Sequence, residues 1–512
     1  MGVATHTGVR RTAQGAGSIT KQAQVYAGAF GGKGVVWMER KAYPMKNNSL
    51  IVTAVTAAAA IVIAGCQKKQ EAQPGAPVTP SASAPRIVSA ERTSFDQVTA
   101  KLDKGGNVYL YLSTEQALLG LSNRLTAASN FVSSLPAISG DGRENLVRLF
   151  GFLNGFVIDS GVSEISGLGV SSIAREKGFY YGKLVLHHYP GENAGVIWSL
   201  FGKAPHRMDG LDLLPQSTAL AIFSDFDFTL AWAKLQDELA SLNIPGVDKA
   251  LKQFPAQFHE KTGLELDDVL KSLGGEYGLI FTLDEHKKIT LPLPNNPLEI
   301  PSPGLAIVVK VNSDLVFDRV ADILEKNQVT SKLVSKVDDT NLKMRTMNVP
   351  LPIPLDLRPS LARSGDYLLV ASSDTLVREI LAVKSGEAKG YKAMAEFKKL
   401  SQDIPDQGNN FALVTGAFAS TMAQVQQKAL ANQAGGAERA QSLQDLLNSG
   451  TNSFSYSVGV NGSEGWEGFA NSSHNLQALI APAAVAGGVA AALAIPAYAK
   501  AHTGSKASSQ SQ

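Results

Sequence analysis

The stretch that decides the fold covers residues 305–326 and reads LAIVVKVNSDLVFDRVADILEK. Its first part, 305–311, is a nearly continuous apolar run, which predicts a buried strand. An Asn-Ser-Asp triplet follows at 312–314, where side-chain oxygens can accept the unpaired N–H groups of a first helical turn. From Val316 onward, apolar residues recur every three or four positions and acidic residues occupy the opposite side. The stretch therefore predicts a strand that leads directly into an amphipathic helix.

The same strand-then-helix order recurs at four other places in the chain. Each junction contains, or lies next to, a Ser, Thr, Asn or Asp that can cap the helix. The four pairs are Val108–Leu112 with Glu115–Asn130, Ala219–Phe223 with a helix ending near Leu239, Tyr367–Ala371 with Thr375–Val383, and Phe411–Val414 with Ala417–Ala429. Their uneven spacing excludes a solenoid of fixed period.

Further segments have the alternating pattern of antiparallel strands. They are Phe179–His188, the hairpin of Lys332–Val337 with Leu342–Met347, and the hairpin of Phe454–Val460 with Gly465–Ala470. Two proline-rich loops, 291–303 and 349–359, are expected to interrupt the core. We therefore predict an α+β fold with mixed sheets and with helices in two similar strand–helix halves, 87–212 and 213–475, which meet near 210–215.

Composition limits the possible functions. The 512 residues include 47 Lys and Arg against 45 Asp and Glu, a net charge of +2, which leaves no basic excess to bind nucleic acid. The one cysteine, Cys66, excludes an internal disulfide framework, a cysteine-based zinc site and an iron–sulfur cluster. We expect the protein to work without a metal or a cofactor.

The clearest targeting signal lies in front of Cys66. A short segment with a lysine, 45–49, precedes the apolar run 50–63, and the run ends in Ile63-Ala64-Gly65-Cys66. This ending resembles the lipobox of bacterial lipoproteins. The resemblance implies diacylglycerol on the Cys66 thiol, cleavage before Cys66 and acylation of the new amine, and two or more acyl chains anchor a protein stably. A buried apolar helix with a chance cysteine is the alternative.

The segments around this signal follow from it. Residues 1–44 either lie upstream of the true start, at Met45 or Met38, or form a disordered extension, and 45–65 is the expected signal peptide. Residues 66–86 are rich in Gln, Pro, Ala and Ser, which predicts an extended tether. We therefore expect the body of the protein in the bacterial cell envelope, on the extracytoplasmic (periplasmic) side of the membrane.

A second apolar segment lies near the end of the chain. Leu476–Tyr498 has no charge and is long enough to cross about 30 Å of hydrocarbon, so 476–499 is a candidate transmembrane helix followed by a polar tail, 500–512. Ala484, Gly488 and Ala492 are spaced by four residues, as in helices that pair closely in membranes, and favour a homo-oligomer. The alternative is an alanine-rich helix that packs on the body.

Four short motifs lie between about Leu213 and Gln424. They are Leu214-Pro215 before a strand, GLELDDVL at 263–270, Leu273-Gly274-Gly275-Glu276 before the strand 277–283, and a Ser-Ser-Asp junction within 368–374. Together they resemble a family of bacterial exported proteins of unknown function. The resemblance implies an extracytoplasmic domain and supplies no catalytic residues. Gly274 and Gly275 are expected to form a tight turn that other residues would strain.

The segment 220–230, LAIFSDFDFTL, resembles the first motif of the haloacid-dehalogenase-like phosphatases, an apolar strand followed by Asp-x-Asp-x-Thr. The resemblance implies Asp225 as the nucleophile, Asp227 as the general acid and base, and magnesium between carboxylate and phosphate. Residues that would complete such a site are Asp338-Asp339, Ser372 and Lys310. Each also has a structural explanation, as a hairpin turn, a helix cap and a strand-end lysine, and Asp225 is itself explained by helix capping.

The other candidate ligands are dispersed. His187 and His188 are adjacent on a strand, so their side chains point to opposite faces and cannot chelate one ion together. The remaining histidines of the body lack the spacing of a zinc helix: His206, His259, His286 and His474. An acidic cluster can hold a cation or, alternatively, form a solvated helix face: Glu265, Asp267, Asp268 and Glu276.

These observations predict a membrane-anchored extracytoplasmic lipoprotein that binds or scaffolds and does not catalyse. Its expected partners are membrane lipid, through Cys66 and the C-terminal helix, and an unidentified protein or ligand. The alternative is a magnesium-dependent haloacid-dehalogenase-like phosphohydrolase that uses Asp225 and Asp227.

Overall fold

The computed structural model describes residues 93–134, 140–191, 194–241, 245–291, 297–348, 357–431 and 453–474. The chain divides into two units, Met1–Pro74 and Gly75–Gln512, and all of the described residues belong to the second. Several sequence predictions lie outside the described residues: the signal peptide, the lipobox Ile63-Ala64-Gly65, Cys66, the tether, and the segment 476–499 with Ala484, Gly488 and Ala492. No helix within the described ranges combines the length and the apolar character needed to cross a membrane.

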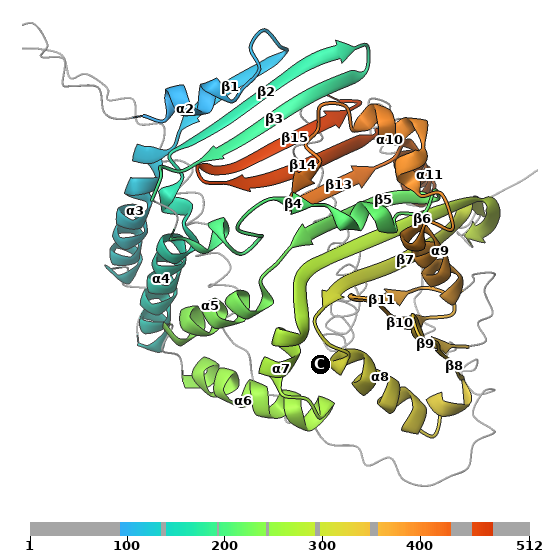
Figure 1. The fold of residues 1–512 in the computed structure, drawn as a ribbon. Coiled ribbons are helices and arrows are strands. Elements are labelled where there is room, and N and C mark those ends of the chain that lie inside the picture. Colours follow the sequence, from blue (N-terminus) through green and yellow to red (C-terminus); the bar gives the residue numbers. More distant parts are fainter. Residues whose placement is uncertain are drawn as a thin grey trace, which may run out of the picture. The chain divides into compact units, whose positions relative to one another are not determined.

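Thirteen strands of the described chain form one sheet, in the order β1-β2-β3-β15-β14-β13-β5-β6-β7-β11-β10-β9-β8 (Figure 1). Their bounds are β1 (Val108–Ser113), β2 (Gly167–Glu176), β3 (Phe179–His187), β5 (Thr218–Asp225), β6 (Leu273–Leu291), β7 (Leu298–Val311), β8 (Val334–Asp338), β9 (Lys343–Met347), β10 (Ser360–Ser364), β11 (Tyr367–Ala371), β13 (Asn410–Val414), β14 (Ser455–Gly462) and β15 (Gly465–Ser472). Two short strands, β4 (His206–Arg207) and β12 (Gln407–Gly408), pair separately. The expected α+β class is confirmed.

Every neighbouring pair in the large sheet is antiparallel, so the expectation of mixed sheets is wrong. The helical connections explain the difference. After β1, β5 and β13, the chain forms helices and then returns as the strand next to the one it left, in the opposite direction. Strands from both sides of the predicted boundary at 210–215 belong to this sheet. Strand β3, which precedes the boundary, pairs with β15, which follows it.

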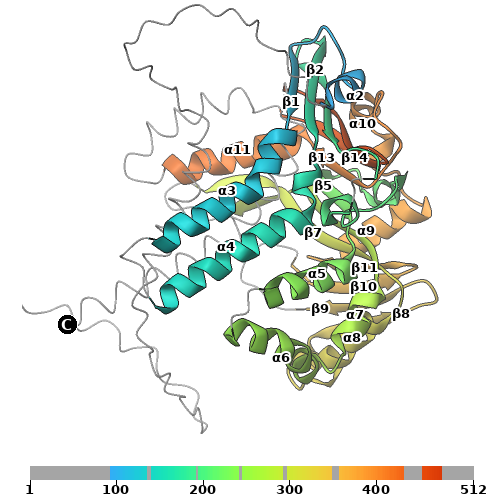
Figure 2. The same cartoon turned by 90° about the vertical axis from the view of Figure 1, so that its left-hand side faces the viewer.

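The helices lie at the ends and on the faces of the sheet. Their bounds are α2 (Phe95–Ala100), α3 (Glu115–Ser134), α4 (Asp141–Ser160), α5 (Phe228–Ser241), α6 (Pro245–Thr262), α7 (Leu266–Ser272), α8 (Leu315–Lys326), α9 (Asp374–Ser385), α10 (Ala395–Leu400) and α11 (Gly416–Ala431). Short 3-10 turns also occur, among them η3 (Asp209–Leu213) and η4 (Thr330–Lys332). Helices α9 and α10 lie over one face, whereas α3, α4 and α11 project on the other side (Figure 2).

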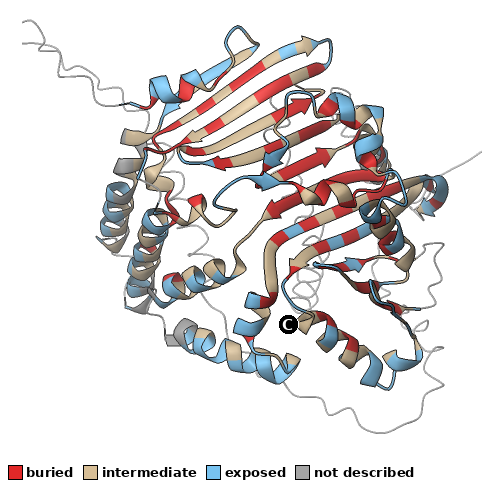
Figure 3. Ribbon diagram, viewed as in Figure 1, coloured by how far each residue is buried: buried red, intermediate tan, exposed pale blue. Residues whose placement is uncertain are grey.

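The main core lies between the central strands and helices α9 and α10. Helix α9 contributes Leu376, Val377 and Ile380 to it, and the stacked rings of Phe223 and Phe411, 5.0 Å apart, come from β5 and β13. The opposite face has a smaller core, in which Phe317 and Ala321 of α8 pack on Val311, Leu361 and Leu368. We call the face under α9 and α10 the core face. Buried residues follow these strands closely (Figure 3).

All five predicted strand–helix units are present, as β1 with α3, β5 with α5, β7 with α8, β11 with α9 and β13 with α11. The predicted hairpins are also confirmed, as β8 with β9 and β14 with β15. In the described residues, the amphipathic stripe predicted from 316 onward covers the smaller core. Local patterns of apolar and capping residues were therefore sufficient to find these elements.

The prediction of the first proline-rich loop is wrong. Instead of a loop over 291–303, β6 extends to Leu291 and β7 begins at Leu298, so that Pro301 and Pro303 lie within a strand. The register shifts between Asp284 and Lys288 on the opposing strand, and prolines are tolerated next to such a bulge because regular ladder bonds are missing there. Of the second loop, residues 349–356 lie outside the described residues.

Candidate functional site

The core face ends in charged side chains where β5 and β7 lead into helices α5 and α8 and where β6 begins after helix α7. Asp225 is the last residue of β5 and lies opposite Glu276 of β6 in the strand register. Phe223 precedes Asp225 by two residues on the same face and belongs to the main core. Lys310 of β7 approaches Glu276, with 3.9 Å between the lysine Nζ and the carboxylate. The face thus changes from apolar to ionic within two residues.

Asp225 is held in place by two side chains from distant parts of the chain. The imidazole Nε2 of His206 lies 2.9 Å from both carboxylate oxygens. The side-chain amide of Asn409 donates to Oδ2 over 3.0 Å, and the backbone N–H of Asp225 donates to the Asn409 carbonyl over 2.8 Å. Both oxygens of the carboxylate therefore have a hydrogen-bonding partner. Here and below, these three residues with Glu276 and Lys310 are called the Asp225 cluster.

Charge within the cluster perturbs the titration of His206. Partial burial lowers its pKa, but the hydrogen bond to Asp225 and the one to the Arg207 carbonyl, together with the negative charge of Asp225, outweigh burial. The pKa of His206 is consequently raised above its ordinary value. Its side chain remains 45% exposed, so solvent screens the pair with Asp225.

Glu276 is the most buried acid of the cluster, with 7% of its surface exposed. Its Oε2 accepts no hydrogen bond from any described residue. Burial raises the pKa of Glu276, the positive charge of Lys310 opposes that shift, and the negative charge of Asp225 adds to it. Two carboxyl groups on neighbouring strands thus have different environments, because one is hydrogen-bonded and the other is mainly desolvated.

The Leu-Gly-Gly-Glu motif sets this geometry. The two glycines were expected to turn the chain before a strand, but they lie inside β6, where the register shifts between Leu273 and Tyr277. The expected turn is therefore a bulge. Gly275 has a φ of +82°, which an L-residue adopts only with strain, and its carbonyl accepts the N–H of Phe226 over 2.7 Å. A Cβ at Gly274 would lie 2.9 Å from the Lys310 backbone.

A hollow of about 540 Å³ adjoins the cluster. Its walls include His206 and Asp225, together with Lys203, Asp227 and the ring of Phe228. The walls therefore combine both signs of charge with an aromatic surface. This composition suits a small ligand that has polar and apolar parts.

The residues of the phosphatase alternative have structural partners. The Oδ1 of Asp227 accepts the N–H of Leu230 over 2.9 Å and so caps the first turn of α5. The Oγ of Ser372 accepts the N–H of Leu305 over 3.1 Å. Asp338 pairs with Arg345 over 2.7 Å. Of the residues expected to complete a phosphatase site, Lys310 alone belongs to the Asp225 cluster in the described structure. Its ion pair with Glu276 places it there.

The other sequence candidates are separate from this cluster. His187 and His188 are both buried, where His187 Nδ1 lies 2.6 Å from the Ser166 hydroxyl and the His188 ring lies 4.5 Å from that of Trp198. Of the acidic cluster, Glu265 pairs with His259 over 3.0 Å. No group of three or more His, Cys, Asp or Glu is placed to hold a metal ion in the described part of the chain.

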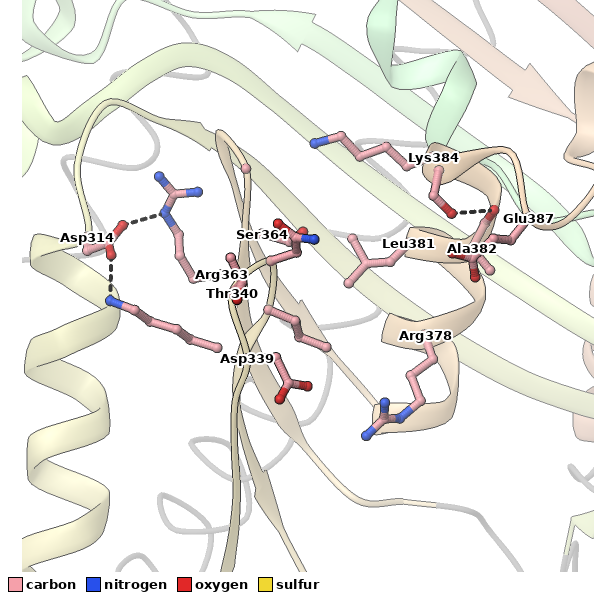
Figure 4. A pocket seen from close by; sticks show the side chains of 15 residues that line it. Asp314, Asp339, Thr340, Arg363, Ser364, Arg378, Leu381, Ala382, Lys384 and Glu387 are labelled. Atoms are coloured by element: carbon pink, nitrogen blue, oxygen red, sulfur yellow. Dashed lines mark hydrogen bonds and ion pairs between the residues drawn. The ribbon is translucent and has the colours of Figure 1, made fainter.

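A larger hollow, of about 880 Å³, lies between α9 and the turns of the β8–β9 and β10–β11 hairpins (Figure 4). Asp314, at the start of α8, forms ion pairs with Lys343 over 2.7 Å and with Arg363 over 2.9 Å. These pairs join α8 to both hairpins, as the dashed lines in Figure 4 show. The charges along this side of the hollow are thus used to hold elements together.

Sequence reasoning joined Asp225 and Lys310 in the phosphatase alternative, but it assigned Glu276 to a separate acidic cluster and did not find that the three residues meet. Asn409 was missed, and His206 was treated as one of several dispersed histidines. Asn409 lies 184 residues from Asp225, so no local spacing connects the two. The signal that was present is the Gly-Gly pair before Glu276, since two glycines inside a strand indicate a bulge or a close backbone approach.

No family model, curated protein or solved structure matches this chain. The resemblance to a family of bacterial exported proteins of unknown function, and the lipobox resemblance, therefore stay predictions.

Proposed function

We propose that the protein is an extracytoplasmic binding module of the bacterial cell envelope, anchored to the membrane through acylated Cys66. The hollow beside the Asp225 cluster is its ligand site in this proposal. The observation that supports binding over catalysis is that both carboxylate oxygens of Asp225 have hydrogen-bonding partners. Hydrogen bonds to both oxygens hold the Asp225 carboxylate in place and lower its nucleophilicity, and His206 and Asn409 engage both oxygens.

Asp227 supports the same conclusion. In the phosphatase alternative this residue donates and accepts the proton of the leaving group, which favours a carboxyl group that is free to reorient. Its carboxylate instead accepts an N–H of α5. Both aspartates of the Asp-x-Asp-x-Thr segment thus organise the start of α5 and the polar end of the core face. A preorganised polar wall of this kind favours recognition of a ligand.

The anchoring part of the proposal rests on the sequence. Acylated Cys66 holds the tether, and 476–499 is proposed as a second membrane contact, with Ala484, Gly488 and Ala492 as the surface for a homo-oligomer. The two similar strand–helix halves are likewise proposed as the finer organisation of the α+β body.

Mass spectrometry of the purified mature protein tests the anchor. A lipid-modified peptide that begins at Cys66 is expected, and a Cys66→Ala variant gives the matched control without modification. Peptides that join 1–44 to an unmodified body would contradict the proposal.

The choice between binding and catalysis is tested with Asp225→Asn. The amide keeps the size of the side chain, so circular dichroism is expected to report an intact fold. If the wild type hydrolyses a phosphate ester with magnesium and the variant does not, Asp225 acts as a nucleophile and the binding proposal is wrong.

A further inference from the structure

Helix α2 and the residues that follow it lie directly on the end of the sheet that begins with β1. Helix α2 contacts β1, β2 and β3 (Figure 1). Val98 and Leu102 pack on Val185 of β3 in a small core that is separate from the main one. The fit is close, because a Cβ at Gly169 of β2 would lie 2.3 Å from Val98. We call residues 94–103 the clasp, which packs through this small core and not through the main one.

Ion pairs fasten the clasp at its C-terminal end. The Lys101 Nζ lies 3.0 Å from a carboxylate oxygen of Glu464, in the turn between β14 and β15, and 2.9 Å from one of Glu467. Asp103 pairs with Lys183 of β3 over 3.0 Å. The hydrogen bond from Lys101 and its positive charge lower the pKa of Glu464. The pair of Lys101 with Glu464 therefore stays ionised at mildly acidic pH, above the ordinary glutamate pKa of about 4.3.

A buried histidine is linked to the N-terminal end of the clasp. Ser94 is buried, and its hydroxyl donates to the Ser166 carbonyl over 2.9 Å. The Ser166 hydroxyl lies 2.6 Å from Nδ1 of His187, which is 1% exposed. The Nε2 atom of His187 has no hydrogen-bond partner among the described residues, and the ring of Tyr189 lies 5.4 Å from the imidazole. Hydrogen bonds thus connect the clasp to a ring nitrogen, while the other nitrogen of the ring has none.

This environment suits a neutral imidazole. In the neutral ring, Nδ1 can carry the one hydrogen and donate it to the Ser166 hydroxyl, which then donates to the His187 carbonyl, 3.1 Å away. A protonated ring also carries a hydrogen on Nε2. That N–H is then a buried donor without an acceptor, and it bears part of a positive charge, which is unfavourable inside a protein.

The charges around His187 act in the same direction as its burial. Four charged or titratable groups face it from the surrounding elements: Lys101 of the clasp, Glu464 of the β14–β15 turn, Glu115 of α3 and its neighbour His188. Burial lowers the pKa of His187, Lys101 and His188 lower it further, and the two glutamates do not reverse the shift. The closed form is therefore fully stable above the ordinary histidine pKa of about 6.5 and loses stability as the pH falls below it.

We propose that the clasp is acid-sensitive: protonation of His187 releases residues 94–103 from β1, β2 and β3 while the remainder of the sheet stays folded. Opening is local because the clasp has its own small core and lies at the edge of the sheet, next to β1. Release exposes Val98 and Val185 and adds residues 94–107 to the tether predicted after Cys66. That lengthening of the tether rests on the proposed anchor, whereas the opening itself does not.

Hydrogen exchange followed by mass spectrometry tests the opening in the purified full chain. Exchange is compared at about pH 7 and about pH 4.5, after correction for the intrinsic effect of pH on amide exchange. Each pH unit below about 6.5 can weaken the protection of the clasp by up to about tenfold, so a loss of about tenfold or more is expected in peptides that cover 94–103. Peptides of α9 are the internal reference and are expected to change by less than about twofold.

Two histidine variants assign the effect to its residue. His187→Gln cannot take up the proton, so its clasp is expected to keep the same protection at both pH values. His259→Gln is the matched control, because His259 lies on α6 with an exposed side chain, and it is expected to follow the wild type.

Several outcomes overturn the inference. Equal loss of protection in α9 and the clasp means that acid unfolds the whole body. No loss in the clasp, or a loss in His187→Gln as large as in wild type, excludes His187 as the trigger. If circular dichroism shows that His187→Gln is unfolded at neutral pH, NMR titration of the wild-type histidines decides, and a His187 that stays neutral while the clasp opens contradicts the inference.

Failure of the anchor is read separately. The acylated chain and the Cys66→Ala variant are expected to open alike, because His187 and the clasp do not include Cys66. A free thiol at Cys66 in mass spectrometry would contradict the anchor and the lengthened tether, and it would leave the result of the exchange experiment unchanged.

Discussion

Helix α9 directly follows strand β11 and helix α4 follows helix α3, and these two helices are buried very differently. In α9, Leu376, Val377 and Ile380 form one stripe that the core face covers completely. In α4, apolar residues occupy a much wider arc, and contacts with α3 and α5 leave Phe156 and Ile158 half exposed. The comparison teaches that apolar content alone does not determine burial. A single stripe needs one covering surface, whereas a wide apolar arc needs more than one.

The largest expected effect comes from shortening a side chain in α9. Ile380→Ala removes a side chain with no exposed surface and leaves a cavity against the core face. We expect the free energy of unfolding to fall by about 2–5 kcal/mol, measured by urea denaturation.

The matched variant in α4 is Ile158→Ala. Because Ile158 is half exposed, its truncation is expected to change the free energy of unfolding by about 0.5 kcal/mol or less in the absence of lipid. Equal losses at 380 and 158 would show that α4 is covered in the free protein, and the contrast between the two helices would disappear.

The same contrast shows how far the sequence leads. Helix α9, the strand before it and a cap in the Ser-Ser-Asp junction are all local, and each was predicted, although the cap was assigned to Ser372 and lies at Ser373. Ser373 accepts the N–H of Leu376 over 3.2 Å, as capping chemistry requires. The order of the strands was not predictable, because pairs such as β3 with β15 join segments nearly three hundred residues apart. No periodicity within a segment encodes such a partner.

The candidate site was predictable only in pieces for the same reason. Asp225 was recognised by its motif and Glu276 by its glycines, but the register that places them opposite each other depends on the bulge at Gly275. The prediction of a loop at 291–303 was wrong because proline was interpreted as the end of a strand. A bulge on the opposing strand removed the hydrogen bonds that proline lacks.

The next prediction concerns the polar edge of the core face, where the backbone is constrained. Gly275→Ala is expected to lower the free energy of unfolding by about 1–2 kcal/mol, because a Cβ disfavours its left-handed conformation. Gly275→Asn is expected to lose less, since Asn adopts this conformation more easily.

Helix α4 supplies the opposite case. Gly151 lies within it, and an added Cβ meets no atom within 4 Å. Gly151→Ala is expected to raise the free energy of unfolding by about 0.5–1 kcal/mol, because alanine is the better helix former. Both variants are measured by urea denaturation. A lower free energy of unfolding for Gly151→Ala, or a higher one for Gly275→Ala, would contradict the view that the backbone is constrained at 275 and has room for a Cβ at 151.

The buried carboxyl group of Glu276 is expected to make stability depend on pH. Burial raises its pKa in the folded state, so the folded protein holds the proton more tightly than the unfolded chain. This stabilisation is complete below the unfolded pKa of about 4.3 and is lost as the pH rises through the folded pKa. Glu276→Gln cannot ionise, and its stability relative to wild type is expected to increase over that range.

Thermal melts from acidic to neutral pH measure this difference. Glu285→Gln, an exposed change on the same strand, is the control and is expected to follow the wild-type profile. A Glu276→Gln profile parallel to that of wild type would mean that Glu276 does not titrate differently in the two states.

The smallest expected effect is a change in the titration of His206. Burial lowers its pKa, and the pairing with Asp225 more than offsets burial, so the folded pKa is raised. The resulting stabilisation is present below the unfolded pKa of about 6.5 and is lost as the pH rises through the folded value. Asp225→Asn removes the negative charge and is expected to lower the pKa of His206, as followed by NMR titration. The effect on stability is small because His206 is half exposed and solvent screens the pair. Asp284→Asn is the control and is expected to leave the pKa of His206 unchanged. An unchanged value in Asp225→Asn as well would mean that the two residues are not paired in solution, and the polar end of the core face would then lack the fixed wall on which the proposed ligand site depends.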